Sequence, residues 1–172
     1  MPDPLAYLVT FSCYGTNLPG QPEASVDKRN NRYGEEYAPE APGLCGYAAS
    51  RMAGRSFTLD QEGRSHCREA IVGFCNSRNI SLVALHVRTT HVHLVAATCL
   101  PADRVLNGLK AACSRKLNRV SGAARRHWTR GGSKRWLWRP DQLVAAVDYV
   151  LRQQGEPMET YFDGEALCVL MR

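Results

Sequence analysis

The sequence predicts one α+β domain with a ferredoxin-like, RRM-like antiparallel sheet, and three observations support this fold class. Strand-like and helix-like segments follow one another along the 172 residues in the order β, α, β, β, α, short β, α. The two central strands are separated only by a tight turn, which makes them antiparallel neighbours. The first two helices are amphipathic, so we expect them to pack on one face of the sheet.

The amino-terminal third contains one strand, one irregular segment and one helix. The first strand is predicted over residues 6–16, where β-branched and aromatic residues are frequent. Residues 17–56 carry many Gly, Pro, Asn and charged residues without a sustained period, so we expect a long irregular insertion. A helix is predicted over 57–79, and Thr58 with Gln61 resembles a capping box at its start.

A β-hairpin with two histidines is predicted in the middle of the chain. Its strands cover 80–89 and 91–98, with a tight turn near Thr89. Because alternate residues of a strand point to the same face, the imidazoles of His91 and His93 project side by side. Two imidazole nitrogens on one surface can hold a metal ion if other groups supply the remaining ligands.

Two helices and a short strand complete the predicted order. One helix covers 100–120, and a short strand covers 135–140. The last helix is predicted over 139–156 and ends at Gly155. We find no internal repeat and no boundary to a second domain, so residues 1–172 are interpreted as one domain.

Two lines of residues run along the last predicted helix. The stripe expected to pack on the sheet consists of Leu143, Val147, Val150 and Leu151. The second line consists of Gln142, Ala146, Tyr149 and Gln153. This second line sets Tyr149 and Gln153 about one turn apart. If it lies over His91 and His93, Gln153 supplies a third metal ligand and Tyr149 stands beside a polarised phosphate.

The charge distribution indicates an acidic partner such as nucleic acid. The formal net charge is +6, and residues 104–139 contain eleven of the 22 Lys and Arg residues and no Asp or Glu. Three tryptophans lie among these basic residues, and exposed aromatic rings can stack on unpaired bases. The residues that we expect to contact DNA are Arg104, Lys110, Arg115, Lys116, Arg119, Arg130, Lys134 and Arg135.

The cysteine pattern and the absence of a long apolar run indicate where in the cell the protein is expected. Seven cysteines, none in a CxxC pair, indicate reduced thiols in a cytosolic protein. The amino terminus does not have the pattern of a secretory signal. No apolar run approaches the roughly 20 residues that cross a bilayer, so no membrane partner is expected.

Together these motifs resemble the single-tyrosine HUH transposases of the smallest insertion sequences and the related repeat-associated tyrosine transposases. Five segments between residues 7 and 162 follow the family order: YLVTFSCYGTNLPG, HVHLV, LKAACSRKLNR, WTRGGSKRWLW and DYVLRQQGEP. HVHL alone is a moderate signal. A downstream Tyr followed four residues later by Gln makes the combination specific. Residues 21–56 do not align with the family pattern.

The resemblance implies a metal-dependent endonuclease and strand transferase that cleaves single-stranded DNA at hairpin-marked sites. It assigns Tyr149 as the nucleophile that forms a 5′-phosphotyrosine intermediate, and His91, His93 and Gln153 as ligands of one divalent cation. Mg²⁺ is the expected cofactor, and Mn²⁺ can substitute because imidazole suits it well.

The resemblance also implies the partners and the location. The expected partner is single-stranded or hairpin DNA. The expected location is the bacterial cytoplasm, with nucleoid association when DNA is bound. Some family members are homodimers with shared active sites and others act alone, and the sequence leaves both arrangements open.

Three alternatives belong to other functional classes. A histidine-triad nucleotide hydrolase needs a third alternate histidine where Val95 stands. A replication initiator or relaxase of the HUH type has a lysine in the helix of its tyrosine, whereas Arg152 and Gln153 follow Tyr149 here. The third alternative is a non-catalytic module that binds single-stranded or hairpin nucleic acid.

Three other polar residues receive no catalytic role from the sequence. His86 is interpreted as a structural residue of its strand. Tyr14 lies in the first predicted strand without a partner at turn spacing. Asp148 adjoins the tyrosine but points elsewhere on the helical wheel.

Overall fold

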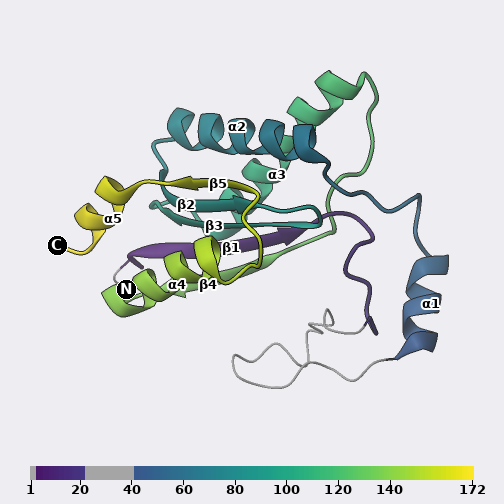
Figure 1. The fold of residues 1–172 in the computed structure, drawn as a ribbon, viewed down its shortest axis with the longest axis horizontal. Helices are drawn as coiled ribbons and strands as arrows, with labels where there is room; N and C mark the ends of the chain where they lie inside the picture. The colour runs from purple at the N-terminus through teal and green to yellow at the C-terminus, as the bar shows by residue number, and fades with distance from the viewer. Residues whose placement is uncertain (1–2, 22–40) are drawn as a thin grey trace.

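The computed structural model describes residues 3–21 and 41–172, which contain a five-stranded antiparallel sheet with helices on both faces (Figure 1). The strands lie in the order β4-β1-β3-β2-β5, and each neighbouring pair is antiparallel. This confirms the predicted α+β class. The strands are β1 (Ala6–Ser12), β2 (Ser81–Val87), β3 (His91–Ala97), β4 (Ser133–Leu137) and β5 (Glu159–Phe162). The helices are α1 (Pro42–Ser50), α2 (Gln61–Ser77), α3 (Ala102–Ser121), α4 (Pro140–Arg152) and α5 (Gly164–Leu170).

Each face of the sheet has its own apolar core. Val9 and Phe11 of β1 point to the core shared with α2 and α3, whereas Ala6 and Leu8 point to the core under α4. Figure 1 shows α2 and α3 on one side of the sheet and α4 on the other. The two helices predicted to share one face do so, and the tyrosine-bearing helix covers the opposite face.

The start of α2 differs from the prediction. The carboxylate of Asp60 accepts a hydrogen bond from the backbone N of Gly63 at 2.7 Å, so Asp60 is the N-cap. The predicted capping box at Thr58 is therefore wrong. An aspartate in the capping position satisfies a free N–H of the first turn, and the helix begins at Gln61.

Three short elements were not predicted. Helix α1 lies within the segment 17–56 that we expected to be irregular; residues 22–40 of that segment lie outside the described residues. None of the side chains of α1 is buried, so no apolar stripe marks the helix in the sequence. Strand β5 and helix α5 are too short to show a clear period. No helix within the described ranges combines the length and the apolar composition needed to cross a membrane.

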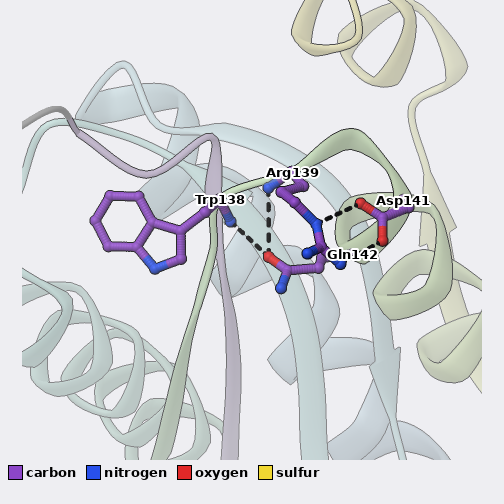
Figure 2. Close-up of polar contacts among 4 residues, drawn as sticks. All are labelled: Trp138, Arg139, Asp141 and Gln142. Atoms are coloured by element: carbon purple, nitrogen blue, oxygen red, sulfur yellow. Dashed lines mark hydrogen bonds and ion pairs between the residues drawn. The ribbon is translucent and has the colours of Figure 1, made fainter.

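Helix α4 is capped by its own first turn and packs as predicted. The side-chain oxygen of Gln142 accepts from the backbone N of Trp138 at 2.9 Å and of Arg139 at 3.3 Å, and Arg139 pairs with Asp141 (Figure 2). Gln142 is therefore a capping residue, far along the helix from Tyr149. The buried side chains of α4 are Leu143, Ala146, Val147 and Val150. Three of these belong to the predicted stripe, while Ala146 belongs to the second predicted line.

Helices α2 and α3 approach each other closely at a glycine. A Cβ atom at Gly108 of α3 would overlap the ring of Phe74 of α2. A planar ring within a packed helix pair cannot move aside without opening neighbouring contacts. The separation of the two helices therefore depends on the absence of a side chain at residue 108.

We predict that Gly108→Ala lowers the free energy of unfolding by about 1–3 kcal/mol, because the added methyl group overpacks the helix interface. Gly73→Ala in α2 is the matched control, since a Cβ there has no atom within 4 Å. The control is expected to gain about 0.5–1 kcal/mol from its higher helix propensity. Urea unfolding measures both, and equal stabilities would contradict the close approach at Gly108.

Candidate active site

A row of polar side chains crosses the face of the sheet that α4 covers. The register pairs Ser133 of β4 with Thr10 of β1, Thr10 with His93 of β3, and His93 with His86 of β2. His86 in turn pairs with Thr160 of β5. Paired residues share a face of the sheet, so all five side chains belong to the α4 face. The next row along the strands is apolar and contains Leu8, Val95 and Ala84.

His91 and His93 lie side by side, as the alternation of β3 predicts. Their ring centroids are 4.6 Å apart. Nδ1 of His93 lies 2.8 Å from the hydroxyl of Thr10, and Nδ1 of His91 lies 2.9 Å from the hydroxyl of Thr90. Nε2 of His93 is buried and has no hydrogen-bond partner among the described residues. A metal ligand in proteins commonly has this arrangement, with one ring nitrogen oriented by a hydrogen bond and the other available.

Both imidazoles are held in the neutral state. Burial lowers the pKa of His93 to about 3, and the charge of His91 adds to this effect. Burial also lowers the pKa of His91, and the charge of Arg88 contributes. Neutral imidazole is the form that binds metal ions, so the pair is available for coordination at physiological pH.

Tyr149 of α4 lies beside the imidazole pair in the same chain. Its ring centroid is 5.5 Å from that of His93, and the two rings meet edge to face. The residue is 38% exposed, whereas His93 is 5% exposed. The phenol is therefore partly exposed beside the buried imidazole of His93, where an incoming molecule can reach it.

His86 holds α4 in this position. The backbone N of Met158 donates to Nε2 of His86 at 3.1 Å, so the ring proton is on Nδ1 and is donated to the carbonyl of Val150 at 3.0 Å. Val150 directly follows Tyr149. Both ring nitrogens of His86 are used within the protein, which agrees with the structural role expected for this residue.

The structure brings Gln154, rather than Gln153, to the imidazole pair. The chain leaves the helix at Gln153, whose amide donates to the carboxylate of Asp148 at 2.7 Å. The side chain of Gln154 lies near both imidazoles, where it partly offsets the lowering of their pKa by burial, and its amide donates to the carbonyl of Tyr149 at 3.2 Å. Gln153, the predicted ligand, thus has its amide at Asp148, and Gln154 is a further candidate for the amide ligand.

The eight basic residues expected to contact DNA have different environments. The three lysines bind groups within the protein: Lys110 binds the carbonyls of Thr129 and Gly131, Lys116 binds Glu69 and Lys134 binds Asp103. Burial lowers the pKa of Lys110 to about 8, so this lysine is a structural tie between α3 and the loop before β4. The exposed members are Arg104, Arg115, Arg119, Arg130 and Arg135.

Only part of the basic segment lies on the same side of the sheet as Tyr149. Arg135 pairs with Leu8, whose side chain belongs to the core under α4, so Arg135 shares the face of the imidazole pair. The arginines of α3 lie in the opposite helical layer. Of the tryptophans, Trp128 is buried, while Trp136 and Trp138 are about half exposed. Of the residues expected to contact DNA, Arg135 is therefore placed on the sheet face that carries the imidazole pair and Tyr149.

Two side chains of the site were missed in the sequence, Thr10 and Gln154. Thr10 and Ser12 alternate as polar residues within an otherwise apolar strand, which is a signal for a polar patch on one face. Gln154 follows Gln153 directly, and the choice between the two amides depends on where α4 ends. Local spacing does not decide that point.

A pair of neutral imidazoles, an amide and a partly exposed tyrosine lie together on one face of the sheet. The family model described as "Transposase IS200 like" matches residues 50–150, which is more than half of the chain. The chain therefore belongs to the IS200-like transposase family, whose members are single-tyrosine HUH transposases, and this confirms the resemblance seen in the motifs.

Among solved structures, the chain is similar to a REP-associated tyrosine transposase bound to a REP hairpin, with 12% sequence identity and a TM-score of 0.47. The similarity covers 86% of this chain and 65% of that chain. No curated protein matches this sequence.

We predict that acid destabilises the protein partly through His93. Between about pH 6.5 and pH 3 the unfolded imidazole binds a proton that the folded one does not bind, so stability falls as the pH falls through this window. One such proton accounts for a slope of at most about 1.4 kcal/mol per pH unit.

The variant His93→Asn lacks this titration and should lose stability less steeply than the wild type between pH 6 and pH 4. Urea unfolding at several pH values measures the two slopes. Identical slopes would show that His93 is protonated as easily in the folded chain as in the unfolded one.

Proposed function

We propose that this chain is a single-stranded DNA endonuclease and strand transferase in which Tyr149 is the nucleophile. The observation that carries the proposal is the 5.5 Å contact between the rings of Tyr149 and His93, on a face where both imidazoles are neutral. Membership of a transposase family supports a DNA substrate. The solved structure reported above was obtained with a hairpin, and we propose that hairpin-marked DNA is the partner here too.

The proposed reaction exchanges one phosphodiester for another. The hydroxyl oxygen of Tyr149 bonds to phosphorus, the bond from phosphorus to the 3′ oxygen breaks, and the departing 3′ oxygen takes up a proton. The product is a 5′-phosphotyrosine and a free 3′-hydroxyl, which a later attack by a 3′-hydroxyl reverses. No nucleotide cofactor is needed, since the phosphodiester bond energy is conserved. A free phenol is almost fully protonated at neutral pH, so its proton must be lost during attack.

The residues present fit a divalent cation. Nε2 of His93 is buried without a partner, His91 is adjacent, and the side chain of Gln154 lies near both rings. Within the described ranges no group of three or more His, Cys, Asp or Glu side chains could hold a metal, so the amide of Gln154 completes the proposed donor set. A bound Mg²⁺ or Mn²⁺ would polarise a non-bridging phosphate oxygen.

The proposed site is complete within one chain. The tyrosine, both imidazoles and the amide come from α4, β3 and the turn after α4 of the same molecule. We therefore propose that the chain can cleave in cis, without a tyrosine from a second copy. The arginines of α3, including Arg115 and Arg119, lie in the helical layer opposite to α4 and are then available to bind the paired part of a hairpin.

We predict that Tyr149→Phe abolishes covalent attachment to DNA and leaves binding within about twofold, since only the nucleophilic oxygen is lost. The probe is a hairpin oligonucleotide with single-stranded flanks taken from the vicinity of the gene of this protein. Denaturing gels with Mn²⁺ measure attachment, and fluorescence anisotropy measures binding.

Tyr161→Phe is the matched control, because the ring of Tyr161 packs against the core on the other face of the sheet. This control should attach DNA as the wild type does. Attachment that persists in Tyr149→Phe would contradict the assignment. A wild-type chain that binds the hairpin and never cuts it would favour the non-catalytic binding module.

We predict that Gln154→Ala lowers the affinity for Mn²⁺ by about tenfold or more in the absence of DNA, since a ligand or its close support is removed. Gln153→Ala is the matched control, and its affinity should stay within about twofold because its amide binds Asp148. Isothermal titration measures both. The reverse order of effects would show that Gln153 is the ligand in solution.

A further inference from the structure

Arg88 shares the sheet face of the imidazole pair. Its backbone N donates to the carbonyl of His91 at 2.9 Å, which sets the two residues opposite each other across the hairpin turn. Val87 points to the core on the α2 and α3 side, so its neighbours His86 and Arg88 both belong to the α4 face. His86, Arg88, His91 and His93 therefore form a compact group on two adjacent strands.

The guanidinium of Arg88 lies beside the turn that follows α4. Nη1 donates to the carbonyl of Glu156 at 3.1 Å. Gly155 has a φ of 73°, and a Cβ there would lie 3.6 Å from Nη2 of Arg88. The same turn carries Gln154, whose side chain lies near both imidazoles. The turn after α4 thus carries the amide and also binds the guanidinium of Arg88.

The charge of Arg88 has no carboxylate partner in the part of the chain that the structure describes. The carboxylate of Asp148 binds Arg152 and Gln153. Besides burial, the charge of Arg88 lowers the pKa of His91 and of His93. A partly buried guanidinium without a counter-charge is unfavourable, and it repels any cation held by the imidazoles. A bound anion between the two would relieve both effects.

We propose that Arg88 binds a non-bridging oxygen of the phosphodiester that Tyr149 attacks; this inference rests on the proposed function. The bond to Glu156 uses one donor of the guanidinium, and the planar group has further N–H donors that can bind phosphate oxygens. The phosphate is then held between a guanidinium on one side and the imidazole pair on the other. Arg88 stabilises the charge that develops on the phosphate oxygens during attack.

Two measurements on Arg88→Gln test the proposal, because they are expected to change in opposite directions. Affinity for the hairpin probe, measured in EDTA in the Tyr149→Phe background, should fall by about tenfold as a charged hydrogen bond is lost. Affinity for Mn²⁺, measured without DNA, should rise several-fold because a positive charge near the imidazoles is removed. Arg88→Lys keeps the charge, so it should weaken DNA binding without raising Mn²⁺ affinity.

Arg51→Gln is the control, since Arg51 is exposed at the end of α1, which lies apart from the sheet (Figure 1). It should change neither affinity. A joint loss of Mn²⁺ and DNA affinity in Arg88→Gln would overturn the proposal, because it would show that Arg88 only fixes the turn of Gln154. Unchanged DNA binding in Arg88→Gln would overturn it as well. A wild-type chain that binds no strand would instead remove the proposed function itself.

Discussion

The candidate site depends on the buried imidazole of His86. One ring nitrogen of His86 donates to the carbonyl of Val150 in α4, and the other accepts from the backbone N of Met158 beyond the turn. These two bonds fix the chain directly after Tyr149 and again beyond the turn that carries Gln154. Protonation of His86 would turn its acceptor nitrogen into a donor and break the bond to Met158. Burial lowers the pKa of His86, which keeps the neutral form and hence the arrangement.

The two faces of the sheet differ in composition: one holds the main apolar core, and the other carries the candidate site. The face toward α2 and α3 holds the larger apolar core, and three of the basic side chains there bind groups within the protein. The face toward α4 carries a polar row that includes Thr10 and His93, followed by an apolar row that supports the helix. Because strand alternation separates the two sets, the polar site is built without opening the main core.

The sequence contains the parts of the site that depend on local periodicity. Alternation in β3 is sufficient to place His91 beside His93, and helical spacing is sufficient to identify the face of α4 that packs on the sheet. Which of the two amides, that of Gln153 or that of Gln154, faces the imidazoles depends on where α4 ends, and bonds from the distant residues His86 and Arg88 help to fix that turn. The lysines of the basic segment show the same limit of prediction from local sequence, because their environment depends on distant residues. Their partners, such as Glu69, lie far away in the sequence, so a count of charges overestimates the surface available to DNA.

The meeting of a phenol and two imidazoles within one chain is tested most directly by mixing two inactive variants. Tyr149→Phe lacks the nucleophile, and the double variant His91→Ala, His93→Ala lacks the imidazole pair. At concentrations where the wild-type chain attaches to the hairpin probe in Mn²⁺, we expect the mixture to give no attached strand. Attachment restored in the mixture would contradict a site built from one chain, because the tyrosine of one molecule would then serve the imidazoles of another.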